Sequence, residues 1–303
     1  MRADDWWLTP LGEKRGYIQP HALRELWFHT GTACNLACPF CLEGSKPGDR
    51  RLGQVGLSDV RPFIDEAVGL GVEQLSFTGG EPFAVRDLVR ILDYALDLRP
   101  CLVLTNGTDP LLRRFPRLEA LREKPCALSL RVSLDHPDVA RHEAGRGAGT
   151  FEKSLRALRL LCERGFRVSV ARQLEKGEDG PAVDAAFRRL FEASGLPADL
   201  RIVAFPDFAR PGAVVDVPHV TEACMTRYHT ESSRREFMCA YSKMVVKLDG
   251  RMRVYACTLV DDDPAYDQGG SLREALGERV LLHHQRCYSC FAYGASCSET
   301  AGA

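Results

Sequence analysis

Short apolar stretches alternate with amphipathic stretches along the first two thirds of the chain. The short stretches are rich in β-branched and aromatic residues, which predicts strands, at residues 26–30, 73–78, 101–106, 128–135, 166–172 and 200–205. The stretches between them repeat apolar residues at helical spacing, near residues 58–68, 88–96, 151–162 and 183–191. Strands that alternate with helices predict a parallel sheet with right-handed crossovers, as an open sheet or a barrel, with the active site at the carboxyl ends of the strands.

The pattern changes after Phe205, where prolines and a glycine mark a junction. Asp249-Gly250 lies between two strand-like runs, at residues 243–248 and 251–256, which predicts a β-hairpin. We therefore expect an N-terminal extension at residues 1–25, a main α/β domain at 26–212 and a small C-terminal domain at 213–303. The small domain is too short and too rich in loops to build a large core by itself.

The amino-acid composition argues against several classes of function. Lys plus Arg total 40 and Asp plus Glu total 41, a balance that argues against nucleic acid or a membrane surface as a partner. The N-terminus lacks the apolar segment of a signal peptide, and no stretch is apolar enough to span a membrane. We therefore expect a cytoplasmic protein. In that compartment the 12 cysteines stay reduced, and clustered cysteines there indicate metal ligands or catalytic thiols.

Three cysteines follow the first predicted strand with the spacing C-x3-C-x2-C, at Cys34, Cys38 and Cys41. Three thiolates so close together can converge on one soft metal centre. Three is an incomplete set for structural zinc or a fully ligated cluster, so an iron–sulfur cluster held here keeps one iron open. A structural zinc loop or unrelated thiols remain alternatives.

This loop resembles the signature of the radical S-adenosylmethionine (SAM) superfamily, and two further motifs fall at matching places. Residues 76–82, SFTGGEP, end the second predicted strand and resemble the GGE motif of that family. Residues 103–107 and 132–135 end the next two strands and resemble positions that line SAM and substrate. The resemblance covers about residues 26–210 and implies a partial (β/α)6 TIM barrel.

The resemblance also implies the chemistry and its residues. Cys34, Cys38 and Cys41 would hold a 4Fe–4S cluster whose open iron binds SAM, and reduction would release a 5′-deoxyadenosyl radical that takes a substrate hydrogen. An electron donor such as flavodoxin or ferredoxin would be needed. The expected contacts to SAM come from the strand ends and from the aromatic residue before the last cysteine: Phe40, Thr78, Gly79, Gly80, Glu81, Asn106 and Ser133.

Two arginines are further candidates for the SAM site. Residues 141–151 resemble the family stretch in which an arginine before a glycine approaches the SAM carboxylate. Guanidinium suits a carboxylate by its bidentate geometry, and Arg146 fits this role better than Arg141. Arg172, at the end of the fifth predicted strand, is the other candidate, with a surface ion pair as its alternative.

The C-terminal region holds a second set of cysteines. Cys239 and Cys257 flank the predicted hairpin, and Cys287 and Cys290 form a C-x2-C pair after the last helix. Four thiolates complete a ligand set for either zinc or an iron–sulfur cluster. Within the radical SAM family this arrangement resembles the twitch module, with one auxiliary 4Fe–4S cluster, more than the SPASM module, with two. Cys224 and Cys297 are alternative ligands.

Two enzymatic functions remain open at this point. One is hydrogen abstraction from a small polar metabolite, leading to oxidation or rearrangement, and the other is modification of a ribosomally made peptide or protein. The short segment before the first strand leaves little room for a peptide-recognition domain, so we expect the small molecule. A non-catalytic iron–sulfur or zinc regulatory protein is the alternative of another class. Asp207 and Arg210 are weak candidates for contacts with substrate.

Overall fold

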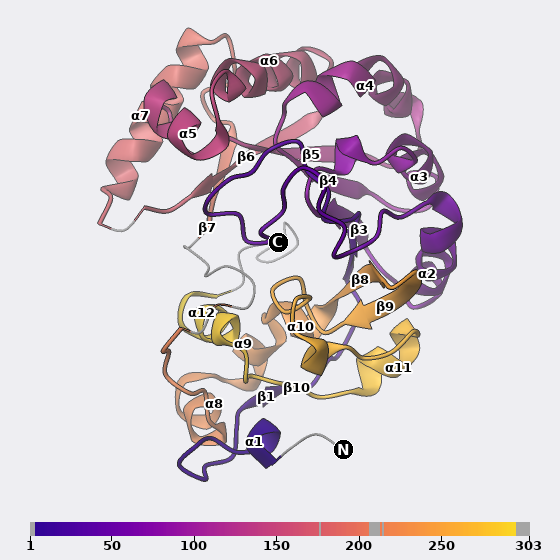
Figure 1. Cartoon of the computed structure of the whole chain (residues 1–303), viewed down its shortest axis with the longest axis vertical. Coiled ribbons are helices and arrows are strands. Elements are labelled where there is room, and N and C mark those ends of the chain that lie inside the picture. Colours follow the sequence, from indigo (N-terminus) through magenta and orange to yellow (C-terminus); the bar gives the residue numbers. More distant parts are fainter. Residues whose placement is uncertain (1–3, 176, 206–212, 214, 295–303) are drawn as a thin grey trace.

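The computed structural model describes residues 4–175, 177–205, 213 and 215–294. Within these residues eight strands form one sheet, in the order β7-β6-β5-β4-β3-β2-β8-β9. Strands β2 to β7 are parallel and follow the order of the chain. The sheet curves, with helices α2, α3, α4, α6 and α7 on its outer side (Figure 1). This confirms the expected α/β fold with a partial barrel.

The barrel strands lie close to the positions predicted from the sequence. They are β2 (Glu25–His29), β3 (Gln74–Thr78), β4 (Cys101–Thr105), β5 (Leu128–Ser133), β6 (Arg167–Gln173) and β7 (Arg201–Phe205). Every residue of β2 is buried, and β3 to β5 are buried along most of their length. Strands covered on both faces read as continuous apolar runs, which is why the sequence located them well.

The helices that cover the barrel present apolar stripes to the strands. They are α2 (Leu57–Gly69), α3 (Leu88–Ala95), α4 (Asp109–Glu119), α6 (Thr150–Glu163) and α7 (Gly180–Ala193), joined by the shorter η1 (Pro82–Ala84), η2 (Ala120–Glu123) and α5 (Val139–Arg146). The sequence reading missed α4. Its apolar face of Leu111, Phe115 and Leu118 is buried, but two prolines and several arginines obscure the periodicity.

The C-terminal hairpin belongs to the same sheet as the barrel. Strands β8 (Ser242–Leu248) and β9 (Arg251–Tyr255) are antiparallel, as predicted. Asp249 and Gly250 both have positive φ, 48° and 76°, as a two-residue type I′ turn requires. Strand β8 also pairs in parallel with β2, which the sequence did not indicate. The hairpin therefore carries its flanking cysteines to the edge of the barrel.

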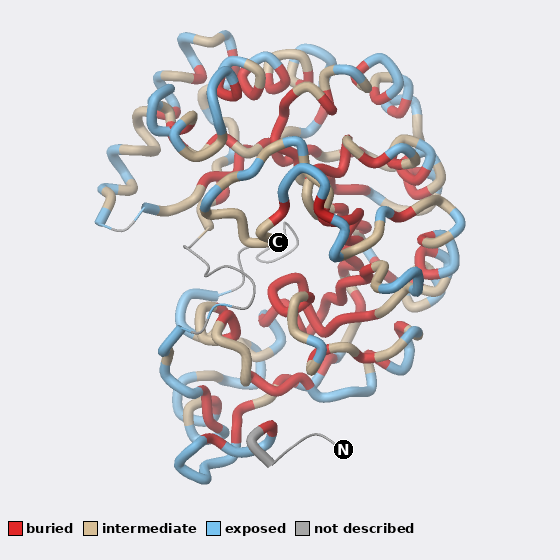
Figure 2. The backbone as a smooth tube through the Cα atoms, in the orientation of Figure 1, coloured by how far each residue is buried: buried red, intermediate tan, exposed pale blue. Residues whose placement is uncertain are grey.

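The remaining C-terminal elements form a second core that includes the start of the chain. These elements are α8 (Glu222–Tyr228), α9 (Glu231–Arg235), α10 (Met238–Tyr241), η3 (Pro264–Tyr266), α11 (Leu272–Gly277), β10 (Val280–Leu281) and α12 (Gln285–Tyr293). Strand β1 (Tyr17–Ile18) pairs with β10, and Trp6, in α1 (Asp4–Trp7), stands 5.1 Å from the ring of Tyr266. Figure 2 shows these buried segments as a region beside the barrel strands. The division at residues 212 and 213 stays a prediction.

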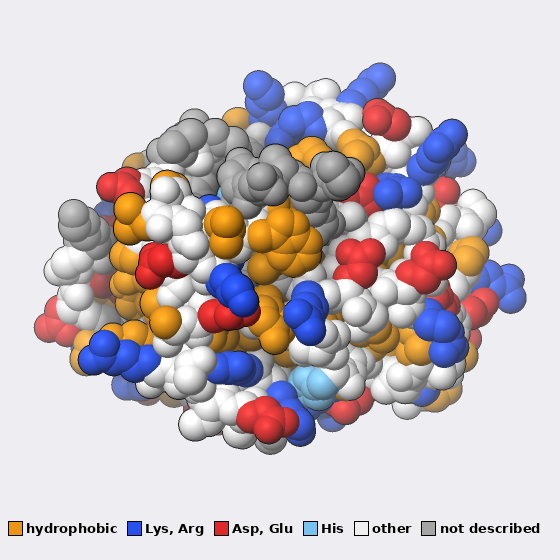
Figure 3. Space-filling model, turned by 90° about the horizontal axis from the view of Figure 1, so that it is seen from below, with side chains coloured by type: hydrophobic (Ala, Val, Ile, Leu, Met, Phe, Trp, Pro, Cys, Tyr) orange, Lys and Arg blue, Asp and Glu red, His pale blue; other side chains and the backbone are white. Residues whose placement is uncertain are grey.

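The surface carries charges of both signs. Basic and acidic side chains lie among hydrophobic ones on the face shown in Figure 3, as the near-neutral net charge suggests. None of the described helices is both long and apolar enough to cross a membrane.

Candidate active site

The main candidate site is a cavity of about 240 Å³ at the carboxyl ends of the barrel strands. Its wall comes from the cysteine loop after β2, from the ends of β3 to β7, and from the loop that follows β9. All but one of the SAM-site residues predicted from the sequence line it: Cys34, Cys38, Cys41, Phe40, Thr78, Gly79, Gly80, Asn106, Ser133, Arg146 and Arg172. The exception is Glu81. Residues far apart in sequence thus surround one space large enough for a small ligand.

The three cysteines of the first motif are free thiols and half-buried. Burial raises the pKa of Cys34 to about 12 and raises the pKa of Cys38 as well. Thiolates are the metal-binding form, so a metal must displace these protons when it binds. Accessible thiols at the wall of a cavity fit a cluster that also has to reach a ligand, which agrees with the three-cysteine spacing.

The two glycines of the GGE motif let the cysteine loop approach the strand end. The Gly80 N–H donates to the Gly31 carbonyl at 2.9 Å, and the Glu81 N–H donates to the Ala33 carbonyl at 3.2 Å. A Cβ atom at Gly80 would lie 2.3 Å from that Ala33 oxygen, a distance that requires the backbone to move. Gly79 has φ of 133°, where side chains are strained. This contact sets the start of the cysteine loop.

We expect Gly80→Ala to displace the cysteine loop, because the new methyl group overlaps the Ala33 carbonyl. The reconstituted variant should hold about four fewer irons per chain, one cluster's worth. Iron and sulfide analysis measures this, beside a melting curve. Gly69→Ala is the matched control, since that glycine ends α2 with no atom within 4 Å of the added methyl group. Wild-type iron content in Gly80→Ala would contradict this interpretation.

Glu81 joins strand ends inside the protein instead of lining the cavity. It is buried, and its carboxylate accepts hydrogen bonds from the Phe83 N–H (3.0 Å), the Thr105 hydroxyl (2.9 Å) and the Asn106 N–H (2.8 Å). Burial raises its pKa to about 7. The expected contact with the SAM ammonium stays a prediction. What the carboxylate does in this structure is tie β3 to the end of β4.

Asn106 connects the end of β4 with the cysteine loop. Its side-chain amide donates to the Asn35 oxygen at 3.0 Å and to the Cys34 sulfur at 3.9 Å. Its oxygen accepts from the Thr108 N–H and hydroxyl. Asn106 therefore orients the loop as well as lining the cavity.

Arg146 lies at the cavity wall beside Phe40. Its Nε donates to Asp135 at 2.5 Å, and its guanidinium stands 5.6 Å from the centre of the Phe40 ring. The side chain is mostly buried, and neighbouring Asp135 raises the pKa of the guanidinium despite the cost of burial. Phe40 packs against Gly145, where a Cβ would come within 2.3 Å of the ring. Asp135 belongs to the predicted strand end at residues 132–135, and it lines the cavity as well.

Arg172 is held in a buried ion pair rather than a surface one. Its guanidinium pairs with Glu178 at 2.5 Å and with Asp184 at 3.3 Å, and its side chain is 2% exposed. It still lines the cavity. Arg141 by contrast pairs with Glu175 near the surface. Of Arg141 and Arg146, only Arg146 lines the cavity.

The four predicted auxiliary ligands gather around a second, much smaller cavity of about 20 Å³. Cys239, Cys257, Cys287 and Cys290 are all buried free thiols, and the rest of the wall is mostly apolar. Burial raises the pKa of Cys257 to about 11 and that of Cys287 and Cys290 to about 12. Four soft ligands that converge in an apolar setting match the chemistry of a fully ligated metal centre.

A buried lysine supplies positive charge beside these thiols. Lys243, on β8, is fully buried and donates to the Gln268 side chain at 2.8 Å. Among the described residues no carboxylate forms an ion pair with it. Burial lowers its pKa to about 8, while Cys239 and Cys257 act in the opposite direction. Thiolates bound to a metal would stabilise an ammonium in this position. The sequence gave no signal of this lysine.

The remaining cysteines and candidate residues lie elsewhere. Cys224 accepts a hydrogen bond from Thr221 and does not line the auxiliary cavity, while Cys101 is buried in the barrel core. Cys297, Asp207 and Arg210 lie outside the described residues.

Comparison with known proteins identifies the main domain. Residues 28–174 match the sequence model of the Radical SAM superfamily. The AdoMet-dependent heme synthase of Nitratidesulfovibrio vulgaris is 31% identical over 141 residues, which cover 46% of this chain and 37% of that protein. The antilisterial bacteriocin subtilosin biosynthesis protein AlbA of Bacillus subtilis is 32% identical over 172 residues, 56% of this chain and 36% of that protein. The matched segments thus span little more than a third of these relatives.

The fold is also shared with solved structures. The structure of anSMEcpe with bound AdoMet and the Cp18Cys peptide aligns with a TM-score of 0.60 at 14% identity, over 88% of this chain and 85% of that one. At such low identity the likeness shows the fold alone. It extends beyond the barrel and over most of the C-terminal region.

Proposed function

This chain belongs to the radical SAM superfamily through residues 28–174, and on that premise we propose that it cleaves SAM reductively and abstracts a hydrogen atom from a peptide. The observation that carries the first part is the cavity at the strand ends, lined by all three cysteines of the C-x3-C-x2-C loop. The domain of this family uses a 4Fe–4S cluster and SAM, and these thiols would hold that cluster.

The chain's own residues would bind and orient the cofactor. When bound and reduced, the cluster supplies the electron that splits SAM into methionine and a 5′-deoxyadenosyl radical, which takes a hydrogen atom from the substrate. The glycine turn at Gly79 and Gly80 would place the cysteine loop, and Arg146 would offer a guanidinium to the SAM carboxylate. Phe40 and Ser133 would contact the adenosine part of SAM. Flavodoxin or ferredoxin is the proposed electron donor.

A peptide is now the better supported substrate class. The expectation of a small metabolite rested on the lack of room for a peptide-recognition domain. The structure of anSMEcpe, aligned over 85% of its length, contains a bound peptide, which supports a peptide substrate for a chain of this fold. The relative AlbA takes part in the biosynthesis of a bacteriocin. The relation to a heme synthase keeps the small molecule as the competing class.

The auxiliary site is proposed to hold one 4Fe–4S cluster in a twitch-like module. The four buried thiols and the ammonium of Lys243 support an anionic metal centre there. Such a centre could orient substrate or accept an electron after hydrogen abstraction. We further propose residues 26–212 and 213–303 as the functional units, although β8 and β9 extend the barrel sheet.

A deuterium-transfer experiment tests the substrate class. Extracts of the source organism grown in heavy water are divided by size and incubated anaerobically with the reconstituted enzyme, dithionite and SAM. We expect deuterium in 5′-deoxyadenosine from the fraction that contains peptides. Prior digestion of that fraction with a nonspecific protease should abolish the transfer. Transfer from the small-molecule fraction that survives digestion would overturn the peptide assignment.

A further inference from the structure

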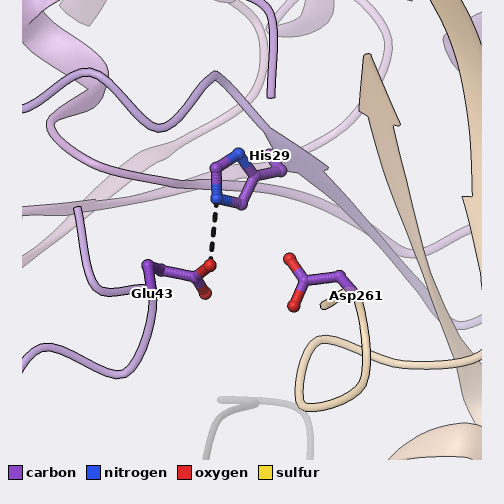
Figure 4. Close-up of side chains that lie close together, drawn as sticks. All are labelled: His29, Glu43 and Asp261. Carbon is purple, nitrogen blue, oxygen red and sulfur yellow. Dashed lines mark hydrogen bonds and ion pairs between the residues drawn. The ribbon is translucent and has the colours of Figure 1, made fainter. Parts of the chain in front are cut away.

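Three side chains meet between the two cysteine sites. His29 ends β2, Glu43 follows Cys41 by two residues, and Asp261 follows Cys257 by four. Their potential ligand atoms all lie within 4.8 Å of one another, and Figure 4 shows the three side chains pointing toward a common space. His29 is fully buried and Asp261 is 5% exposed. Neither Glu43 nor Asp261 has a role in the function proposed above.

Asp261 is the unusual member of this group. Both of its carboxylate oxygens are buried and have no hydrogen-bond partner among the described residues. A buried carboxylate without partners is strongly disfavoured, and it faces the second carboxylate, of Glu43. Like charges this close cannot both persist unless a proton or a cation lies between them. The arrangement therefore requires a proton or a cation bound between the two carboxylates.

The histidine is directed at Glu43 and not at Asp261. His29 Nδ1 accepts a hydrogen bond from the Gly31 N–H at 3.1 Å, so the ring proton resides on Nε2. Nε2 then donates to Glu43 at 3.2 Å (Figure 4). His29 therefore acts as a donor that orients the Glu43 carboxylate, and it leaves both oxygens of Asp261 without a hydrogen bond.

The two neighbouring arginines are engaged elsewhere. Arg51 pairs with Asp49 at 2.7 Å and donates to the backbone carbonyl of Glu43. Arg286 pairs with Asp262 at 3.3 Å and donates to the backbone carbonyl of Leu42 at 3.2 Å. The positive charges of both arginines stabilise the Glu43 carboxylate electrostatically. Neither arginine donates a hydrogen bond to the oxygens of Asp261. The direct partner of Asp261 must therefore be something other than a side chain of this group.

We propose that Glu43 and Asp261 bind one divalent cation, with His29 as the positioning residue for Glu43. Carboxylate oxygens favour hard cations such as Mg²⁺ and Mn²⁺, which commonly use one or two protein carboxylates and keep several waters. A hydrogen bond from a neighbouring imidazole fixes the orientation of such a ligand. Glu43 also lines the main cavity, so the cation stands at the wall of that cavity, where an anionic group of a ligand can complete its coordination.

Manganese binding tests the proposal on the full, reconstituted chain. In the oxidised protein the 4Fe–4S clusters are diamagnetic, so the electron paramagnetic resonance signal of free Mn²⁺ reports how much is bound. We expect about one Mn²⁺ per wild-type chain, displaced by excess Mg²⁺. Asp261→Asn should raise the dissociation constant at least about 10-fold, and Asp249→Asn should leave it unchanged, because Asp249 is an exposed turn residue whose positive φ suits asparagine.

Iron analysis and a second variant separate loss of the cation site from loss of a cluster or of the fold. Iron and sulfide are determined for every sample, which separates loss of the cation site from loss of a cluster. If Asp261→Asn is unstable, Glu43→Gln replaces it, with the same expected weakening. No manganese bound by a wild-type chain that carries its full iron, or equal binding by the variants, would overturn the proposal and leave the two carboxylates sharing a proton. Neither result bears on SAM cleavage, which is measured separately.

Discussion

Replacement of Cys34, Cys38 and Cys41 by alanine is expected to abolish release of 5′-deoxyadenosine. These thiols stand on one loop at the wall of the main cavity, and no other described cysteine lines that wall. Without them nothing remains to hold a cluster in contact with SAM, so electron transfer to SAM has no route. Anaerobic reconstitution should give about eight irons per wild-type chain and about four per variant chain, the difference of one four-iron cluster.

The control for this prediction removes thiols that only pack. Cys126 and Cys162 contact the barrel core as partly buried residues, and their double alanine variant should keep wild-type iron and activity. Chromatography and mass spectrometry quantify 5′-deoxyadenosine after addition of dithionite and SAM. If the triple variant still cleaves SAM, these cysteines do not form the radical-generating site.

Replacement of Cys239 and Cys257 by alanine is expected to destabilise the C-terminal core and remove the auxiliary metal. These buried thiols stand with Cys287 and Cys290 around a small cavity, and Trp6 and β1 pack into the same hydrophobic core. Metal binding contributes folding free energy directly in such sites. Loss of a structural metal belongs to the few changes that cost more than about 4 kcal/mol, which lowers the melting temperature by about 8 °C or more.

Metal analysis distinguishes the possible occupants of this site. The double variant should keep about four irons, those of the radical-generating site, and should still release some 5′-deoxyadenosine without substrate. About four irons and one zinc in the wild-type chain would replace the auxiliary cluster with a zinc site. Unchanged iron and an unchanged melting temperature in the variant would remove the metal assignment altogether.

Local patterns explain what could be predicted. Strands β2 to β5 are buried along most of their length, so each one reads as a short apolar run in the sequence. The turn at Asp249 and Gly250 follows from the backbone conformations that these residues tolerate. The spacing of Cys34, Cys38 and Cys41 lies within one loop, so three ligands for one centre could be recognised without knowing the fold. Helix α4 was missed because Pro110 and Pro116 interrupt an otherwise regular apolar stripe.

Features that depend on distant segments needed the structure. A hairpin pattern does not say which edge it joins, and only the fold shows β8 beside β2, more than 200 residues earlier in the chain. That pairing brings the loop after Cys257 to the cavity formed by the first cysteine loop. It also places Asp261 against Glu43 and His29.

The sequence by itself determined the order of strands and helices, the radical SAM loop and the identity of the seven cysteines that surround the two cavities. Turn conformations and the spacing of ligands within one loop depend on only a few neighbouring residues, so these features can be predicted from the sequence. The tertiary structure decided that Glu81 joins strand ends and that Lys243 lies near the auxiliary thiols. It also decided that the Asp261 carboxylate has no hydrogen-bond partner among the described residues. These depend on packing between remote segments and on the exclusion of water, which no local pattern records.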